Sequence, residues 1–504
     1  MTTDQGHRPI VWTIAGSDPS AGAGLQADLK TMYGLGAYAC TVVSALTVQN
    51  TNGVFAIAPV APELLRDQIE RLAEDLPPVA IKLGMLGGAE QVRVVADFLA
   101  TTEAFVVCDP VLAATSGAPL LDEAGRRLLV ERILARADLV TPNIPELGKL
   151  LGPDFHGMDE TVEAASGRLS CGAAALQAAA QALLQCGARA VLLKGGHIAG
   201  EFCQDYFSDG RQSFWLTSER QLVRHTHGTG CTLASAIAAA RALGHSLAEA
   251  LVIAKAYLNQ GLRCGEDLGQ GHGSLAHLGW PAAPEDLPWL TGTAEAGQIR
   301  PHFRDCGPQP LGLYPLVERA AWLEKLVPLG VTTVQLRAKD LAGAALEKEV
   351  VTAIDYARRH AVRLFINDAW ELALKHGAYG VHLGQEDLAG VEVSALARGG
   401  LRLGISTHDY AELAGAAALR PSYIAIGPVF ATATKALAYP PLGVAGFQRL
   451  AQLAPAPVVA IGALTPERVP GLRAAGAGGF AVIGDLLHAA DLAGRVREWQ
   501  RVLA

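Results

Sequence analysis

The chain has 504 residues, half of them hydrophobic, and a formal net charge of −8 at pH 7. One hydrophobic core cannot serve a chain of that length, so roughly two to four domains are expected. The negative charge, with lysines and arginines scattered, disfavours nucleic acid or an anionic membrane surface as the main partner, and no stretch is long and uncharged enough to span a bilayer.

The cysteines and the start of the chain indicate a cellular setting. The eight cysteines form no CxxC pair and show no disulfide-framework spacing, which is typical of a reducing, cytoplasmic environment. The polar start, residues 1–9, leads directly into the apolar run 10–14, so we expect no signal segment before the fold.

Short β-rich runs, several of them separated by alanine- and leucine-rich helical stretches, occupy the first half of the chain. Six runs are expected to be strands: Val11–Ala15, Thr41–Ser44, Ala80–Met85, Phe105–Cys108, Leu139–Thr141 and Ala190–Leu193. This alternation predicts a mostly parallel sheet covered by helices on both faces. The fold class of this half is therefore α/β, as an α/β/α sandwich.

Polar residues follow three of these predicted strands. Asp109 ends the fourth run, Asn143 and Glu146 follow the fifth, and Lys194 follows the sixth. An amide and a carboxylate just beyond a strand can hold a hydrated magnesium that bridges phosphates, with Asp109 positioning the ion or its waters. Lys194 offers a cation near a transferred phosphoryl group. Taken singly, each acid or amide is more often a helix cap, and a lone lysine is more often a surface charge.

A glycine-containing segment, residues 227–232, precedes a strong helix former. Gly228, Thr229 and Gly230 let the backbone turn free N–H groups toward a ligand, and the helix dipole favours negative charge there. A tight loop explains the same residues equally well. Cys231 slightly favours the anion site, since a thiol at a helix N-terminus has a lowered pKa and can act as a base.

Two familiar nucleotide motifs are excluded. Residues 22–27 fit the dinucleotide fingerprint G-x-G-x-x-A after a strand, but residues 45–50, about twenty positions on, contain no acid for a ribose. NAD binding is therefore rejected. The Walker phosphate loop is also missing, so a kinase in this half must have another architecture.

The distinctive segments of this half lie at residues 15–30, 49–51, 82–85, 109–111, 141–146, 194–197 and 227–232. Over about residues 10–270 they resemble hydroxymethylpyrimidine/phosphomethylpyrimidine kinase of the ribokinase-like superfamily. Cys231 stands where the wider superfamily usually carries an aspartate, a substitution typical of this kinase. The resemblance implies successive phosphorylation of 4-amino-5-hydroxymethyl-2-methylpyrimidine and its monophosphate by ATP and magnesium. It also implies that Gln49 bonds the pyrimidine, that Gly228–Cys231 hold the phosphate, and that Asn143 with Glu146 organises the metal.

Between about Cys264 and Leu311 the apolar periodicity fades and prolines accumulate. Such a stretch is typical of a connector between independently packed units. We therefore expect one domain over residues 1–270, a linker over 271–309 and a second domain over 310–504.

Eight strand candidates follow the connector: Leu311–Tyr314, Thr333–Leu336, Leu364–Ile366, Gly380–Leu383, Leu403–Ile405, Tyr423–Ile426, Val458–Ile461 and Phe480–Ile483. Eight strands alternating with helices in this length predict a compact (β/α)8 TIM barrel. The carboxyl ends of its strands would form the catalytic face.

Asp368 and Asp387 follow consecutive predicted strands, so we expect them side by side at one mouth of the barrel. Two carboxylates plus substrate phosphates suit octahedral magnesium. Groups at neighbouring strand ends supply donors for a diphosphate: Gln335, Arg337, Lys339 and Lys435. Any one of them alone would more often be a solvated charge.

A second anion site is indicated by the ends of strands seven and eight, where barrels commonly bind phosphate through backbone N–H groups. Gly462 with Ala463 and Ile483 with Gly484 occupy these ends. Hydroxyl donors nearby are Thr432 and Thr434. Ordinary barrel closure also explains glycine at a strand end, but the residue chemistry favours phosphate.

This half resembles thiamine-phosphate synthase over about residues 310–504, through the segments 312–315, 335–339, 365–368, 380–387, 404–408, 423–430, 434–435 and 460–462. The resemblance implies that Gln335–Lys339, Asn367, Ser406 and Lys435 grip a pyrimidine diphosphate, with Asp368 and Asp387 on magnesium. The thiazole phosphate would be faced by Thr432, Thr434, Ala463, Ile483 and Gly484. Lys339 and Lys435 would neutralise the departing diphosphate.

Two positions depart from the synthase pattern. Ala463 stands where the family usually has a second glycine, and Gly484 where a small hydroxyl residue is common. Backbone donors survive both changes. We therefore expect the phosphate site to persist with altered side-chain contacts and altered affinity.

The two resemblances concern consecutive steps, so the sequence predicts a bifunctional thiamine-biosynthesis enzyme with small-molecule substrates, ATP and Mg²⁺. One alternative is a pyridoxal-type or sugar kinase fused to a thiazole tautomerase-like barrel. Another makes one half a silent binding or regulatory module. The chain retains the residues expected to bind the diphosphate and its magnesium, which argues against the tautomerase; they are Lys339, Asp368, Asp387 and Lys435. The presence of Cys231 and of both carboxylates argues against the silent module. The formation of a homo-oligomer stays open.

Overall fold

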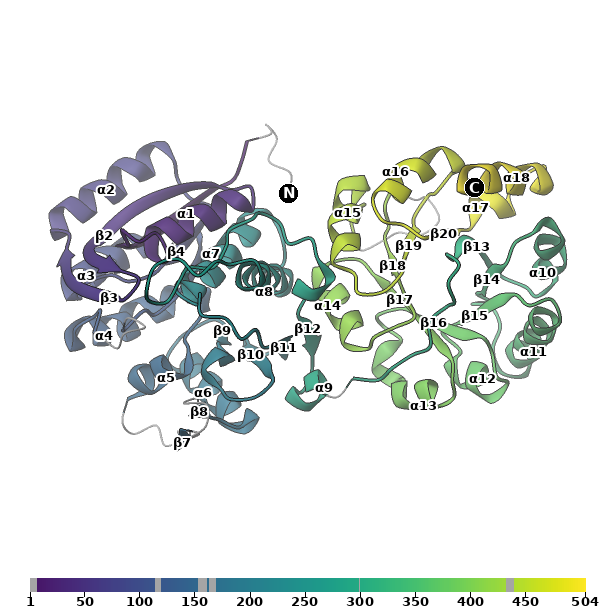
Figure 1. The fold of residues 1–504 in the computed structure, drawn as a ribbon, viewed down its shortest axis with the longest axis horizontal. Coiled ribbons are helices and arrows are strands. Elements are labelled where there is room, and N and C mark those ends of the chain that lie inside the picture. The colour runs from purple at the N-terminus through teal and green to yellow at the C-terminus, as the bar shows by residue number, and fades with distance from the viewer. Residues whose placement is uncertain (1–6, 114–118, 153–160, 163–168, 299, 432–438) are drawn as a thin grey trace. The chain divides into compact units, whose positions relative to one another are not determined.

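The computed structural model describes residues 7–113, 119–152, 161–162, 169–298, 300–431 and 439–504 (Figure 1). The chain forms two compact units, one made of residues 1–281 with 286–298 and the other of residues 282–285 with 299–504. Within the described ranges, no helix combines the length and the apolar character needed to cross a membrane.

The first unit is built on a ten-stranded sheet with the order β12-β11-β10-β9-β6-β5-β4-β1-β2-β3. The central strands from β9 to β2 run parallel, while β3 at one edge and β10, β11 and β12 at the other pair antiparallel. The strands are β1 Ile10–Ser17, β2 Tyr38–Asn50, β3 Gly53–Pro59, β4 Ala80–Leu83, β5 Phe105–Cys108, β6 Leu139–Val140, β9 Val191–Leu193, β10 Phe202–Ser208, β11 Ser213–Glu219 and β12 Trp289–Thr291. A separate pair joins β7 Thr161–Val162 to β8 Leu169–Ser170.

Helices cover both faces of this sheet, as the alternation in the sequence predicts. Successive residues of a strand point to opposite faces. On β1, Trp12 and Ile14 enter the apolar core that α2, α3, α5 and α6 cover, whereas Thr13 between them bonds Asp28 of α1. The helices are α1 Gly24–Gly34, α2 Pro62–Asp75, α3 Ala89–Leu99, α4 Glu123–Leu128, α5 Ile144–Leu151, α6 Ala173–Gln185, α7 Thr229–Ala242, α8 Leu247–Arg263 and α9 Ala294–Gln298. The predicted α/β/α sandwich is confirmed.

Four strands of this sheet have no counterpart among the six expected runs. They are β3, β10, β11 and β12, all of them antiparallel. β10 and β11 are not continuous apolar runs, so their sequence signal is weaker, whereas β3 is apolar but follows β2 after only two residues. The stretch 271–309, expected to be a linker, contains β12 and α9, and β12 adds to the sheet through pairing with β11.

The second unit is a closed barrel of eight parallel strands in sequence order, as predicted. Each expected strand overlaps an observed one. The strands are β13 Gly312–Val317, β14 Thr333–Leu336, β15 Arg363–Asn367, β16 Gly380–Leu383, β17 Arg402–Thr407, β18 Tyr423–Ile426, β19 Val458–Ile461 and β20 Gly479–Val482. The helices between and after them are α10 Ala321–Leu326, α11 Gly343–Arg359, α12 Trp370–Lys375, α13 Val393–Arg398, α14 Tyr410–Ala418, α15 Gly443–Leu453, α16 Val469–Ala474, α17 Gly484–Leu487 and α18 Leu492–Leu503.

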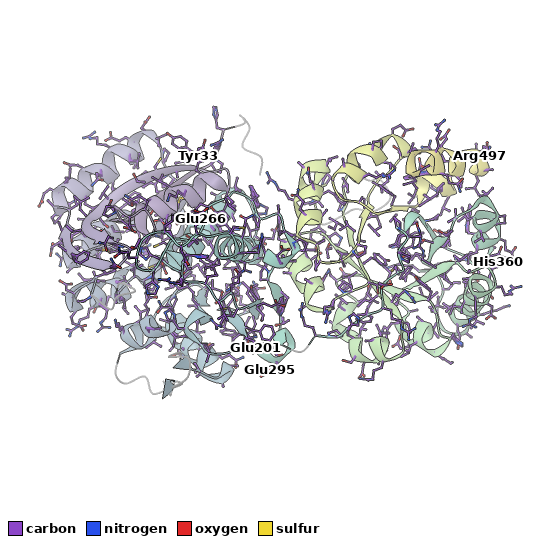
Figure 2. All side chains as sticks on the ribbon, in the orientation of Figure 1. Tyr33, Glu201, Glu266, Glu295, His360 and Arg497 are labelled. Atoms are coloured by element: carbon purple, nitrogen blue, oxygen red, sulfur yellow. The ribbon has the colours of Figure 1, made fainter. Side chains whose placement is uncertain are left out.

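The interior of the barrel is filled with side chains rather than open. Tyr314, Phe365 and Tyr423 are almost fully buried and pack ring against ring. Polar side chains of the outer helices face outward, as His360 after α11 and Arg497 on α18 do (Figure 2). Because the interior is packed, the polar residues beyond the carboxyl ends of the strands are left to form a site at the rim.

Candidate active sites

The glycine segment before α7 forms a close junction with the segment before α1. Gly228, the residue preceding α7, has a φ of +82°, and a Cβ there would lie 1.8 Å from the carbonyl oxygen of Gly22. Only glycine fits this position. The backbone N–H of Thr232 makes the first intrahelical bond, to Gly228. The N–H groups of Gly230 and Cys231 therefore stand at the open end of the helix, as an anion site requires.

Lys194 and Asp109 lie directly beside this helix end. Lys194 Nζ is 2.6 Å from Asp109 Oδ1, which also accepts a hydrogen bond from Thr141. A Cβ on Gly230 would lie 3.1 Å from Lys194 Nζ and 3.2 Å from Asp109 Oδ2. Burial alone would lower the pKa of Lys194, but the charges of Asp109 and Glu146 outweigh it and raise that pKa. The structure thus places the Lys194 ammonium group next to the N-terminus of α7.

Asn143 and Glu146 form a complete capping box at the start of α5. The Asn143 side chain accepts from the Glu146 N–H, and the Glu146 carboxylate accepts from the Asn143 N–H. Both residues therefore act as helix caps, which was the alternative that the sequence left open. Burial raises the pKa of Glu146 to about 7, while Lys194 lowers it and Asp109 raises it further. The same carboxylate thus belongs to the electrostatic cluster around Lys194.

The expected lowered pKa of Cys231 is wrong. Cys231 does lie in the first turn of α7, but burial raises the pKa of its thiol to about 11, although the charge of Lys82 opposes the rise. Desolvation disfavours the thiolate more than the helix end and one lysine favour it. Cys231 is therefore a thiol at neutral pH in this structure.

Gln49 contacts two residues that the sequence reasoning did not single out. Its Nε2 atom lies 3.2 Å from His227 Nε2, which lies 3.0 Å from Asp18 Oδ2. Asp18 also accepts from the N–H groups of Ser20 and Ala23, and burial raises its pKa less than these bonds lower it, to about 2. The only sequence signal was that Asp18 and His227 fall inside the quoted motifs.

A buried ion pair lies beneath Cys231. Lys82 Nζ is 2.8 Å from Asp28 Oδ2, and both side chains are fully buried. Thr13 and Ser235 donate hydrogen bonds to the same carboxylate at 2.6 and 2.7 Å. Asp28 is thus fully satisfied, which is how a buried charge is tolerated. A lysine inside the apolar run Ala80–Leu83 was the available signal.

At the rim of the barrel, Asp368 and Asp387 lie close enough to interact directly. Burial, and then the charge and side-chain contact of Asp368, raise the pKa of Asp387. Lys339 Nζ lies 3.1 Å from Asp368 Oδ2, with the lysine side chain 53% exposed and the aspartate 30%. Asp368 has a φ of +59°, a conformation that a non-glycine residue rarely adopts. The structure therefore gathers the two acids and one of the predicted donors.

Other predicted donors lie on adjacent strands. Asn367 ends β15 opposite His382 of β16, and Arg337 follows β14 with its N–H bonded to Val317. Gln335 on β14 and Ser406 on β17 are bonded to side chains of the barrel interior. Three further predicted residues lie outside the described ranges: Thr432, Thr434 and Lys435.

The ends of β19 and β20 show the expected backbone features. Gly462 has a φ of +110°, and a Cβ there would lie 2.8 Å from Pro428, so glycine is required. Ala463 follows with a φ of +48°, a left-handed conformation that explains why glycine is usual there. Ile483 immediately precedes α17, which starts at Gly484. Both strand ends thus place backbone N–H groups in turns.

Comparison with known proteins assigns both units. The sequence pattern of phosphomethylpyrimidine kinase matches residues 18–276, and that of thiamine monophosphate synthase matches residues 315–486. A probable thiamine biosynthetic bifunctional enzyme, chloroplastic, from Oryza sativa subsp. japonica is 32% identical over 98% of this chain and 89% of its own length. The chain belongs to the bifunctional thiamine-biosynthesis enzymes. Its first unit is a phosphomethylpyrimidine kinase domain and its second is a thiamine-phosphate synthase domain.

Partial relatives match the units separately. A thiamine-phosphate synthase from Yersinia pestis (strain Pestoides F) is 50% identical over 39% of this chain and 88% of its own length. A solved structure of pyridoxal kinase from Staphylococcus aureus in complex with ADP is 29% identical, with 56% of this chain and 98% of that chain covered and a TM-score of 0.49.

Proposed function

We propose that the kinase domain phosphorylates hydroxymethylpyrimidine twice with ATP and Mg²⁺, and that the synthase domain joins the resulting diphosphate to a thiazole phosphate. The observation that supports this most strongly is the joint placement of Lys194, Asp109 and the open end of α7, together with the paired acids Asp368 and Asp387 on the barrel rim.

In the kinase domain, the phosphoryl group in transfer would lie against the N–H groups of Gly230 and Cys231, with Lys194 offsetting its charge. Gln49, held near His227, would bond the pyrimidine ring. Cys231, once ionised, would take the proton of the attacking hydroxyl as the new phosphorus–oxygen bond forms, while the bond between the γ-phosphorus and the bridging oxygen of ATP breaks and ADP leaves. Asn143 and Glu146 would orient the Mg²⁺ of the nucleotide, and the Lys194 ammonium remains charged throughout.

In the synthase domain, the donor set fits magnesium. Two carboxylates in contact raise the pKa of one of them, and a divalent cation between them would remove that repulsion. Among the described residues, no three His, Cys, Asp or Glu side chains gather to hold a metal, so Asp368 and Asp387 would need oxygens from substrate and water. Bound Mg²⁺ would supply positive charge to the departing diphosphate.

The residues expected to bind the diphosphate then have defined tasks. Lys339, Lys435 and Arg337 would hold the diphosphate as its carbon–oxygen bond breaks, and the electron-rich aminopyrimidine would carry the developing cation. The thiazole nitrogen forms the new carbon–nitrogen bond, and pyrophosphate leaves. The thiazole phosphate would lie against the turns at Gly462 and Gly484.

Two half-reactions test this proposal separately. With hydroxymethylpyrimidine, ATP and Mg²⁺, we expect the monophosphate to form first and then the diphosphate. Chromatography of samples taken over time measures both products. Phosphorylation of pyridoxal but not of the pyrimidine would contradict the kinase assignment. With synthetic pyrimidine diphosphate and thiazole phosphate but no ATP, we expect thiamine phosphate and pyrophosphate in equal amounts. Release of neither would contradict the synthase assignment.

A further inference from the structure

Five polar side chains form a continuous hydrogen-bonded chain through the interior of the barrel. Gln335 Nε2 lies 3.2 Å from the Tyr314 hydroxyl, which lies 2.8 Å from the Tyr423 hydroxyl. Tyr423 in turn lies 2.7 Å from His382 Nδ1, and His382 Nε2 lies 2.9 Å from Ser406 Oγ. The five residues come from β14, β13, β18, β16 and β17 respectively. We call these five residues the barrel relay.

The barrel relay is shielded from water along most of its length. Tyr314, Tyr423 and Gln335 are at most 2% exposed, and His382 is 7% exposed. Burial raises the pKa of both tyrosines well above the ordinary value. Both ring nitrogens of His382 face hydroxyl oxygens rather than a carboxylate. Each hydrogen that lies between two of these buried groups must therefore meet an acceptor on its neighbour.

The amide of Gln335 sets the direction of these bonds. Its nitrogen faces both tyrosine hydroxyls, whereas its oxygen, Oε1, is buried and bonds nothing among the described residues. If the amide were inverted, its oxygen would face the hydroxyls and the two hydrogens of its nitrogen would have no acceptor. Leaving two donor hydrogens unpaired costs more free energy than leaving one oxygen unpaired. Gln335 therefore donates to Tyr314 at this end.

The remaining donors follow in order because each tyrosine has a single hydroxyl hydrogen. Tyr314 accepts from Gln335 and donates to Tyr423, which then donates to His382 Nδ1. His382 must carry its proton on Nε2 and donates it to Ser406 Oγ. The hydrogen of the Ser406 hydroxyl is left to point away from the relay.

We propose that the barrel relay is a one-directional hydrogen-bond chain that fixes Ser406 as a donor and Gln335 Oε1 as an acceptor for the ligand of this barrel. Tyr314, Tyr423 and His382 are positioning residues in this chain. The ligand must present an N–H group to Gln335 and an acceptor atom to Ser406, and an aminopyrimidine diphosphate has both. The identity of this ligand rests on the proposed synthase function, whereas the direction of the bonds does not.

The protonation of His382 tests the direction of the relay without any substrate. The ring nitrogens of His382 in the full-length chain are recorded by proton–nitrogen correlation spectroscopy and assigned by their loss in His382→Gln. We expect a neutral ring protonated at Nε2 alone. A ring protonated at Nδ1 alone would mean that the chain runs in the opposite direction and would overturn the proposal.

Tyr423→Phe tests the coupling between the relay and the ligand. Because the variant removes the hydrogen that Nδ1 accepts, we expect a mixture of His382 tautomers and a kcat/KM for pyrimidine diphosphate about tenfold lower. Tyr379→Phe is the matched control, since Tyr379 also packs on Phe365 but its hydroxyl bonds the carbonyl of Cys306 outside the relay. We expect Tyr379→Phe to change neither quantity.

Tyr314→Phe is a second variant that tests the relay if Tyr423→Phe proves unstable. The Tyr423 hydroxyl can still donate to Nδ1 in this variant, so His382 should stay protonated at Nε2 while kcat/KM falls, since Gln335 loses its bond to Tyr314. Unchanged tautomer and kinetics in Tyr423→Phe, as in its control, would overturn the proposal. A wild-type chain that makes no thiamine phosphate would instead refute the synthase function, and the His382 ring would still report the relay.

Discussion

The two candidate active sites of this chain use charge in opposite ways. In the kinase domain, cations and carboxylates are buried and paired: the side chains of Lys82 and Asp28 are fully buried, and Asp109 beside Lys194 is 2% exposed. On the synthase rim, Lys339 is half exposed, and Asp368 lies against a second carboxylate. The candidate kinase site is thus preorganised by its own ion pairs, whereas on the synthase rim two carboxylates lie in contact and the pKa of one of them is raised.

This difference has energetic consequences. Removing one partner of a buried pair leaves an uncompensated charge, which is strongly destabilising. An exposed pair contributes little to stability because water screens it. Substitutions in the kinase site should therefore affect folding as well as catalysis, whereas substitutions on the rim should affect catalysis alone.

The largest expected effect is on the kinase reaction. Cys231→Ala removes the proposed base and should lower kinase kcat by on the order of 10²–10⁴-fold, with synthase kcat unchanged. Since burial raises the pKa of Cys231 to about 11, the wild-type kinase rate should rise with pH up to that value. Cys231→Asp should move this rise into the acidic range. A wild-type rate that levels off near pH 7 would show that Cys231 is not the base.

The next largest effect is on the synthase reaction. Asp368→Asn should lower synthase kcat roughly 10²–10³-fold, the range typical of one preorganised electrostatic group, and leave kinase kcat unchanged. Asp340→Asn is the matched control, because Asp340 is an exposed acid of the same barrel paired with Arg319. Equal losses in both variants would mean that overall charge, not the carboxylate pair, supports the reaction.

Stability measurements test the contrast between buried and exposed pairs. Lys82→Met leaves Asp28 buried without its cation and should lower the free energy of unfolding of the kinase domain by about 3–5 kcal/mol. Lys339→Met on the rim should change that of the synthase domain by less than about 1 kcal/mol. Denaturant titration of each variant against wild type supplies both values. Similar losses in the two variants would contradict the comparison.

The smallest effect concerns backbone conformation. Ala463→Gly relieves a left-handed residue and should stabilise the synthase domain by about 1 kcal/mol, after the entropy of the more flexible unfolded chain is counted. The matched control is Ala475→Gly. Ala475 has a φ of −81°, so this change relieves no strain and should destabilise the synthase domain. Thermal unfolding compares them. Destabilisation in both would show that the turn at Ala463 is unstrained.

The local pattern of the sequence was enough to predict much of this architecture. Every barrel strand was located, because buried parallel strands are short apolar runs bounded by polar residues. The order of these strands also placed Asp368 beside Asp387, since neighbouring strands end at the same rim. The antiparallel strands at the two edges of the kinase sheet escaped detection for different reasons. β10 and β11 carry polar residues and β12 has only three residues, whereas β3 is apolar but follows β2 after only two residues.

Contacts between distant residues could not be predicted from one sequence. Lys82 and Asp28 are 54 positions apart, and Tyr314 and Tyr423 are 109 apart, so only tertiary packing brings each pair together. The prediction of a lowered pKa for Cys231 was wrong for the same reason. Its position at a helix N-terminus is readable from the sequence, whereas the burial that dominates its titration is not.

The central claim is that one chain carries out both consecutive steps. The most direct measurement supplies the purified protein with hydroxymethylpyrimidine, thiazole phosphate, ATP and Mg²⁺ and follows all products by chromatography. We predict that thiamine phosphate accumulates and that Asp368→Asn stops the reaction at pyrimidine diphosphate. Accumulation of pyrimidine diphosphate without thiamine phosphate in the wild-type protein would contradict the claim.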